Sequence, residues 1–154
     1  MAKIFIDTEI WSFGLKKPDK SDPENIINRF TIANNFIVER IKNDQIFITT
    51  HQICEIFHVL SFRGKKLPIE FTISYIEHLL SLSNISTITI ATSHLKRAFL
   101  LSKTSGIHIW DYLCIIPLIH NLDIIYTCDK HFNTESFQKL KIPIQNPLNF
   151  WLEL

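Results

Sequence analysis

Short apolar runs alternate with longer amphipathic segments along the whole chain, and this alternation constrains the fold more than any other feature. The runs have the length of buried strands, and the segments between them have near-helical spacing of apolar residues. Strands separated by helices pair in parallel, with helices on both faces of the sheet. We therefore predict an α/β protein, a three-layer α/β/α sandwich with a short, mostly parallel sheet of four to five strands. The predicted strands are Lys3–Ile6, Gln45–Thr49, Ser86–Ile90, Leu122–Thr127 and Pro143–Gln145.

Helices are predicted between these strands from spacing and from residues that start or stop helices. Thr50 can cap one helix, Pro68 suits the first turn of another, and Gly64 and Gly106 end helices. Pro117 should kink or break the helix that contains it. The polar segment Leu15–Asn25 is a loop. The predicted helices are Glu24–Asn43, Thr50–Phe62, Pro68–Leu82, Ala91–Lys103, Ile107–His120 and Thr134–Leu140, with a terminal turn or helix at Pro147–Leu154.

Composition excludes several broad classes. A hydrophobic content of 46% excludes wholesale disorder, and the 154 residues contain no dividing linker, so we expect a single domain over residues 1–154. The longest apolar run, Tyr112–Ile119, is too short to cross a bilayer, and Asp7 comes too early for a signal peptide. We expect a cytoplasmic protein with no membrane association. Three dispersed cysteines argue against a disulfide framework, and three dispersed glycines exclude the usual phosphate-binding loops.

Two predicted strands end in an aspartate, Asp7 after the first and Asp129 after the fourth. Ligands of open parallel sheets bind at the carboxyl ends of the strands. A carboxylate placed there is costly to desolvate unless something compensates its charge, and Mg²⁺ or Mn²⁺ suits such oxygen ligands. The alternative is that each aspartate caps a helix.

Two further acids, Glu55 and Asp111, have apolar neighbours on both sides within predicted helices. Surface carboxylates usually have polar neighbours on their helical face. Each of these acids, taken alone, is compatible with a solvated or capping role. They indicate a functional site only in combination with Asp7 and Asp129.

The order Asp7, Glu55, Asp111, Asp129 resembles that of the PIN-domain nuclease family, and especially the VapC-like toxins of type II toxin–antitoxin pairs. The resemblance lies in Asp7 at the end of the first strand, Glu55 after the second, and Asp111 before the fourth. The segment Thr127–Phe132 resembles the T-x-D-x-x-F ending of the family. Together these motifs extend over most of the chain, from Ile4 to Phe132.

The resemblance implies that Asp7, Glu55, Asp111 and Asp129 ligate one or two Mg²⁺ or Mn²⁺ ions and are the catalytic residues. The implied activity is metal-dependent hydrolysis of RNA phosphodiester bonds by an endoribonuclease, the toxin partner of an antitoxin protein. Thr8 and Thr127 match family positions where a hydroxyl lines the pocket. Family members commonly form dimers, so we expect a homodimer through the helices between Glu24 and Leu82.

Charge is compatible with an RNA substrate. Gathering four of the 15 acids in one pocket leaves 11 acids against 16 Lys and Arg, a charge of +5 elsewhere. Such a surface attracts a polyanion. The basic runs Lys16–Lys17, Arg63–Lys66 and Lys96–Arg97 either contact the RNA backbone or are solvated surface.

Alternatives remain open from sequence alone. The protein could be an RNA-processing or RNA-decay nuclease without an antitoxin, or an inactive PIN-like module that binds RNA or protein. A small upstream gene for a short DNA-binding protein would favour the toxin.

Glu9 is either an additional outer acid or a loop residue. His51, Glu55 and His58 share a helical face, but Glu-x-x-His occurs once, so we expect partly exposed helix histidines rather than a di-iron site.

Overall fold

The computed structural model describes residues 1–152, which contain a five-stranded sheet in the order β3-β2-β1-β4-β5. Every neighbouring pair of strands is parallel. The first strand therefore lies at the centre of the sheet, with its neighbours drawn from distant parts of the sequence. The prediction of a short parallel sheet is confirmed. The strands are β1 (Lys3–Ile6), β2 (Gln45–Thr49), β3 (Ile85–Ile88), β4 (Ile124–Tyr126) and β5 (Ile144–Gln145).

Seven α-helices connect the strands in the described part of the chain. They are α1 (Thr8–Leu15), α2 (Glu24–Asn43), α3 (Thr50–Phe62), α4 (Ile69–Ser81), α5 (Thr92–Ser105), α6 (Ile109–Ile115) and α7 (Glu135–Gln138), with short 3-10 turns at Ile116–Leu118 and Lys130–Asn133. Instead of the expected terminal turn or helix at Pro147–Leu154, the described residues end in bends and an isolated bridge between Leu152 and Asp129. The last two residues of that segment, and of the expected domain, lie outside the described residues.

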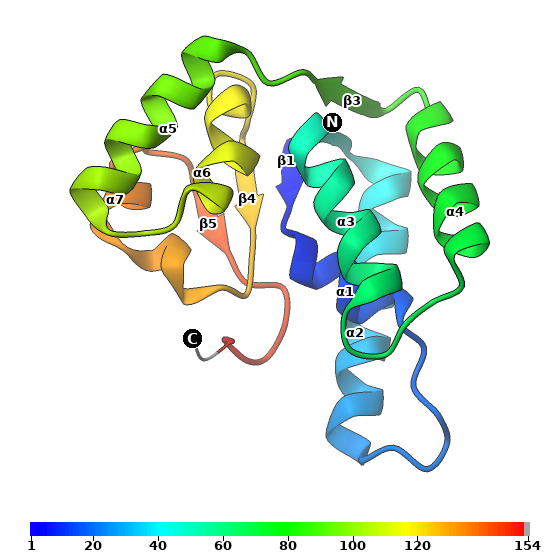
Figure 1. Ribbon diagram of the computed structural model, residues 1–154. Coiled ribbons are helices and arrows are strands. Elements are labelled where there is room, and N and C mark those ends of the chain that lie inside the picture. The colour runs from blue at the N-terminus through cyan, green and yellow to red at the C-terminus, as the bar shows by residue number, and fades with distance from the viewer. Residues whose placement is uncertain (153–154) are drawn as a thin grey trace.

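Alternating side chains of the strands divide the core into two clusters, one on each face of the sheet. Ile4 and Ile6 of β1 pack with buried residues of α1, α2, α3 and α4. Phe5, between them, points to the opposite face and packs with buried residues of α5, α6 and α7. Figure 1 shows the two groups of helices on opposite sides of β1 and β4. This arrangement agrees with the expected α/β/α layers.

Pro117 ends helix α6, as expected. The regular helix stops at Ile115, and the chain continues as the 3-10 turn that contains Pro117. A proline ring cannot fit inside a helix without displacing the preceding turn. The bulky residues that follow Asp111 are buried in the core. Tyr112, for example, stacks on Phe137 with ring centroids 4.8 Å apart.

The sequence pattern did not predict helix α1. Five of its eight residues are buried, so it has no polar face to give the period of an amphipathic helix. Asp7 caps its first turn, and the helix returns the chain from the end of β1 against α2. The expected cap of α3 also shifts by one residue, since the Thr49 hydroxyl, not that of Thr50, accepts from the Gln52 amide.

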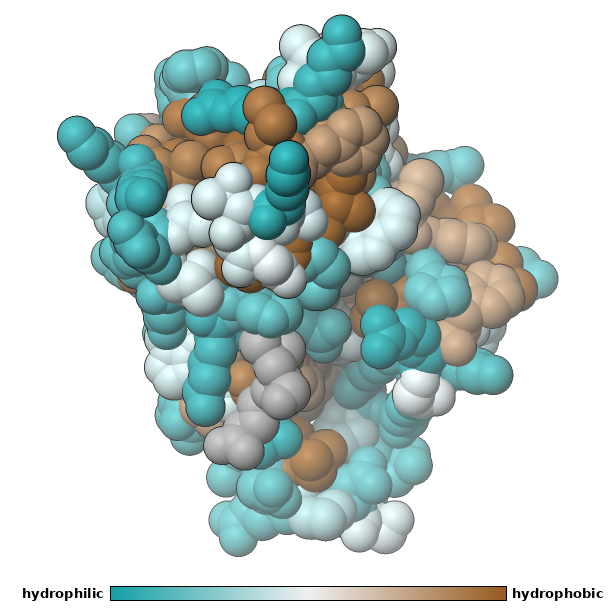
Figure 2. Space-filling model, turned by 60° about the vertical axis from the view of Figure 1, so that its left-hand side comes forward, coloured by the Kyte–Doolittle hydropathy of each residue, from teal (hydrophilic) through white to brown (hydrophobic). Residues whose placement is uncertain are grey.

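The surface carries some exposed hydrophobic residues. Figure 2 looks toward the side of the molecule that carries α5, where hydrophobic surface lies among hydrophilic side chains. Phe99 and Leu100 of α5 are 57% and 66% exposed. Helix α4 exposes a second set, Ile69, Phe71, Ile73 and Leu80. Within residues 1–152, no helix combines the length and apolar character that crossing a membrane requires.

Gly14 allows α1 and α2 to pack closely. A Cβ atom built at this position would lie 2.5 Å from Cδ1 of Ile37 and 3.1 Å from the backbone of Ala33. Ile37 and Ala33 are both buried, so neither can move freely. The spacing of these two helices therefore depends on a residue without a side chain.

We expect Gly14→Ala to lower the free energy of unfolding by about 1–3 kcal/mol, the usual cost of overpacking a core. Urea denaturation measures the change. Ile37→Val removes the Cδ1 atom nearest the new methyl group, so the double variant should be more stable than the sum of the two single changes predicts. Strict additivity would show that this contact is not the cause.

Candidate metal centre

Asp7 and Asp129 follow the carboxyl ends of adjacent strands. The Asp7 amide donates to the Tyr126 carbonyl over 2.9 Å, which continues the pairing of β1 with β4. The Asp7 carboxylate is buried and accepts from the Thr8 amide at 2.8 Å and from the Thr127 hydroxyl at 2.7 Å. Asp7 thus caps α1, the alternative role considered above. Each of its oxygens keeps a lone pair for a further partner, so the two roles are compatible.

Thr127 links the two aspartates. Its hydroxyl donates to Asp7 and accepts from the Asp129 amide over 3.0 Å. The Asp129 carboxylate in turn accepts from the His131 amide at 2.8 Å and caps the turn Lys130–Asn133. The buried Thr127 hydroxyl therefore connects the Asp7 carboxylate to the backbone of Asp129.

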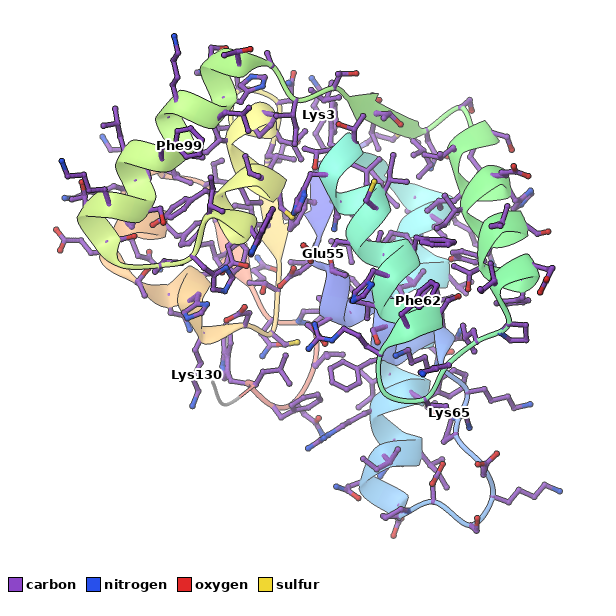
Figure 3. All side chains as sticks on the ribbon, in the orientation of Figure 1. Lys3, Glu55, Phe62, Lys65, Phe99 and Lys130 are labelled. Carbon is purple, nitrogen blue, oxygen red and sulfur yellow. The ribbon has the colours of Figure 1, made fainter. Side chains whose placement is uncertain are left out.

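Glu55 reaches the same region from α3. The buried Gln52 side chain donates to the Ile6 carbonyl over 2.7 Å and so fixes the start of α3 against the end of β1. Glu55 lies one turn further along. Figure 3 shows it on the side of α3 that faces α6, and its Oε2 lies 4.0 Å from the Cys114 Sγ.

Asp111 comes from the first turn of α6. An acidic side chain here often reaches back to the amide of the capping residue. His108 is that residue, but α6 has no side-chain cap. The Asp111 Oδ2 instead lies 3.1 Å from the His131 Nδ1 and 3.5 Å from the His108 Nε2.

The four carboxylates are close enough to affect one another's ionisation. Burial raises the pKa of Asp7 well above its usual value; the bond from Thr127 opposes this rise, and Asp111, Asp129 and Glu55 add to it. Burial raises the pKa of Asp111 to about 8, and repulsion from Asp129 and Glu55 contributes. The structure thus brings together all four acids singled out in the sequence.

Glu55 differs from its neighbours because basic groups surround it. Burial raises its pKa, but the hydrogen bond from His51, the nearby Thr8 hydroxyl and the charges of His51 and His108 together lower it below the usual value. Among Asp7, Glu55 and Asp111, Glu55 is therefore the acid that ionises most readily. A negative charge is maintained in the pocket even where Asp111 is protonated.

Glu9 is a fifth acid at the edge of this group, and it lies in α1 rather than in a loop. Burial raises its pKa, Arg63 and Lys16 oppose the rise, and Glu55 and Asp129 add to it. Glu9 consequently lies between the carboxylates and a group of basic residues.

Histidines beside the acids are the feature that sequence reasoning missed. His51 is only 18% exposed, its Nε2 lies 3.2 Å from Glu55 Oε2, and its ring stacks on Trp110 with centroids 5.4 Å apart. His51 is partly exposed, as expected, but its stacking on Trp110 was not predicted; His58 is exposed and stacks on Phe62. The sequence does contain an indication of these contacts, since three of the four acids have a histidine within four residues along the chain.

The donor set fits a hard divalent cation. Four carboxylates supply oxygen ligands, which Mg²⁺ and Mn²⁺ prefer, and their mutual repulsion is what a cation would relieve. The Thr8 Oγ1 is buried without a well-formed hydrogen bond to any described residue. An unsatisfied buried hydroxyl beside Asp7 is compatible with a bound ligand or water in the pocket.

Comparisons with known proteins identify the fold. The sequence matches no protein-family model, and no curated protein sequence matches it at a significant level. The fold resembles a chain in the crystal structure of VapBC2 from Rickettsia felis bound to a DNA fragment from their promoter. That chain has a TM-score of 0.56 and 19% identity, and the match covers 94% of this chain and 98% of the other.

Two further structures are similar. One is FitAcB from Neisseria gonorrhoeae, with a TM-score of 0.52, 15% identity, and coverage of 96% and 99% of the two chains. The other is DNA-bound VapBC from Salmonella typhimurium, with a TM-score of 0.52, 18% identity, and coverage of 96% and 100%. At these identities the likeness establishes a shared fold over nearly the whole chain.

We expect Asp111→Asn to reduce the pH dependence of stability in metal-free protein. A carboxyl with a pKa of 3.8 when unfolded and about 8 when folded binds more protons in the folded state between these values. Its contribution to stability therefore falls as pH rises from about 4 to 8. In EDTA, the variant should gain melting temperature relative to wild type as pH rises from 5 to 8.

Adding Mn²⁺ at pH 8 should raise the melting temperature of the wild type more than that of Asp111→Asn, because only the wild type keeps all four ligands. If the melting temperatures of both proteins changed equally with pH over this range, the pKa of Asp111 would not be raised in the folded protein. An unchanged wild-type melting point at millimolar Mn²⁺ would contradict a tight metal site.

Proposed function

We propose that this protein is a metal-dependent endoribonuclease of the PIN-domain type, acting as the toxin of a type II toxin–antitoxin pair. The observation that carries the proposal is the convergence of Asp7, Glu55, Asp111 and Asp129 at the carboxyl edge of a parallel sheet, where burial, together with repulsion from the neighbouring carboxylates, raises the pKa of Asp7 and Asp111. Carboxylates held this close together resist ionisation because their charges repel one another, and a divalent cation would relieve that repulsion.

Each acid has a role in this proposal. Asp7 and Asp129, joined through Thr127, hold the principal Mg²⁺ or Mn²⁺, and Asp111 completes its set of ligands. Glu55 holds a second ion or orients the attacking water. A bound ion of this kind neutralises phosphate oxygens and makes its bound water a stronger nucleophile. Such hydrolysis requires no nucleophilic side chain.

Basic residues near the pocket support an RNA substrate. Lys16 Nζ donates to the Arg63 carbonyl over 2.7 Å, and Lys65 Nζ donates to the Lys17 carbonyl over 2.6 Å. Two basic runs that are distant in sequence are therefore adjacent. Lys16 and Arg63 also act on the pKa of Glu9, at the edge of the acidic group. This basic cluster is placed to hold a phosphate backbone that extends from the pocket.

The structural neighbours support a partner protein. Two of them are named VapBC, and the sequence motifs of this chain resemble VapC-like toxins. We extend the proposal to an antitoxin partner and to a homodimer. The helices between Glu24 and Leu82 supply an apolar face for the dimer, because α4 exposes Phe71 and Ile73 beside an apolar groove of about 250 Å³ between α3 and α4.

Replacing Asp7 by Asn keeps the shape of the side chain and removes the charge that the metal requires. We expect Asp7→Asn and Asp111→Asn to reduce RNA cleavage by on the order of a hundredfold, since metal-ion catalysis supplies several kcal/mol and each 1.36 kcal/mol is tenfold in rate. The measurement is cleavage of labelled single-stranded RNA with Mn²⁺ by the purified proteins.

Asp123→Asn is the matched control. Asp123 precedes β4 at the opposite edge of the sheet and accepts from the Lys3 amide, a bond that an Asn oxygen can also accept. This variant should cleave at the wild-type rate. Equal cleavage by all four proteins would assign the activity to a contaminant or another site. RNA binding without cleavage by wild type would favour an inactive PIN-like module.

Light scattering tests the dimer. We expect a mass about twice the 18.1 kDa of the chain, and we expect Phe71→Ser to shift it toward the monomer. Phe99→Ser in α5 is the control, because it removes an equally exposed phenyl ring from a different face. Dissociation by the control alone would place the interface on α5, and a monomeric wild type at high concentration would remove the homodimer.

A further inference from the structure

We infer that His108, Asp111 and His131 form a binding site for a transition-metal ion such as Zn²⁺, in addition to any hard cation held by the four carboxylates. The residues come from two separate elements, the start of α6 and the turn after β4. The inference does not depend on the protein being a nuclease, because two of its three ligands are imidazoles that the proposed function does not use, and only Asp111 is shared with the carboxylate pocket.

The spacing of the donor atoms fits a single small ion. His131 Nδ1 and His108 Nε2 lie 3.1 Å and 3.5 Å from the same oxygen, Asp111 Oδ2, and each of the three residues offers a ligand atom within 4.8 Å of those of the other two. Zinc bonds to nitrogen and oxygen are about 2.0–2.1 Å, so two ligand atoms of a tetrahedral site lie about 3.3 Å apart. The two distances to Asp111 bracket this value.

The two imidazole rings are held in different orientations. Their centroids are 5.2 Å apart and their planes are inclined by 77°, so the two rings meet edge to face rather than stacked. Ligands of a tetrahedral site must point at the ion from separate directions. Two rings inclined in this way can meet this requirement.

Local structure leaves these side chains available. Asp111 lies where an acidic residue often caps a helix, yet α6 has no side-chain cap. The His131 amide is bonded to Asp129, which fixes the backbone and leaves the ring to face Asp111. The first turn of α6 is therefore arranged around the Asp111 carboxylate and its two histidines rather than around its own free amides.

The donor set indicates the class of ion. Imidazole suits zinc, copper, iron and nickel, whereas Mg²⁺ prefers oxygen ligands alone. The exposed fractions are 16% for Asp111, 25% for His131 and 52% for His108, so the site opens to solvent on the His108 side. Three protein ligands with an open fourth position form the arrangement in which zinc keeps a water molecule.

A second group, His51, Glu55 and Cys114, also has donor atoms within 4.8 Å of one another. Its sulfur is a weaker candidate ligand because the thiolate must form first. The Cys114 Sγ also lies 4.0 Å from Glu55 Oε2, farther than either histidine nitrogen lies from Asp111 Oδ2. The geometry therefore favours His108, Asp111 and His131, and the two groups are separable by experiment.

The first experiment is equilibrium dialysis of the full chain against Zn²⁺ in the presence of millimolar Mg²⁺. We expect His108→Asn and His131→Gln each to weaken the Zn²⁺ affinity at least about tenfold, since even changes to outer partners of metal ligands cost 10–100-fold. Asn is a favoured helix cap, so His108→Asn preserves the start of α6. Thermal melting verifies that both variants fold.

Two matched variants separate this site from its alternatives. His58→Gln removes an exposed histidine outside both groups and should leave the affinity unchanged. Asp7→Asn disables the proposed hard-cation pocket and should change Zn²⁺ affinity less than either histidine variant does, because Asp7 acts on Asp111 only through its charge, and this distinguishes failure of this inference from failure of the proposed nuclease. Loss of affinity in Asp7→Asn with none in His108→Asn would place the ion among the carboxylates and overturn the inference.

The second experiment uses Co²⁺ as a coloured substitute for Zn²⁺ in the wild-type protein. We expect the visible absorption of a four-coordinate site without a sulfur-to-cobalt charge-transfer band, since all three ligands are nitrogen or oxygen. A charge-transfer band that disappears in Cys114→Ser would assign the ion to His51, Glu55 and Cys114. That result, or the absence of saturable Zn²⁺ binding by wild type, would overturn the inference.

Discussion

The Ile6 carbonyl, at the end of the central strand, is the acceptor on which the pocket depends. It receives the indole of Trp11 at 3.1 Å from α1 and the amide of Gln52 at 2.7 Å from α3. All three residues are buried, so water cannot substitute for either donor without opening the core. One backbone oxygen thus fixes two helices relative to β1, and with them Asp7, the next residue along the chain, and Glu55.

The acids of the site differ in whether histidines lie beside them. Asp7 has only hydroxyl and amide donors, whereas Glu55 and Asp111 face histidines from α3, α6 and the turn after β4. The result is an oxygen-rich interior bordered by imidazoles on one side. Separate cation preferences can therefore exist within one small region, since oxygen and nitrogen donors attract different ions.

The sequence predicts the strands and their parallel pairing well, because buried strands are encoded locally, and the four acids that it singles out lie close together in the structure, while their role stays a prediction. It also predicts the break at Pro117, which is encoded locally too. It fails for α1, whose burial on most sides removes the amphipathic period, and it does not predict the stacking of His51 on Trp110, which comes from another helix. Spacing alone placed His51 beside Glu55 but could not show how deeply α6 covers it. Tertiary contacts decide such positions.

The position of β1 has a consequence for synthesis of the protein. A chain emerging from the ribosome up to β3 contains β1, β2 and β3, but β1 still lacks its other neighbour, β4, and the pocket holds only Asp7 and Glu55. Asp129 is paired with Leu152, which is made later still. Contacts this distant in sequence form slowly. The nascent chain therefore has no assembled pocket until β4 and Asp129 have been made, and whatever the pocket does begins only after that point.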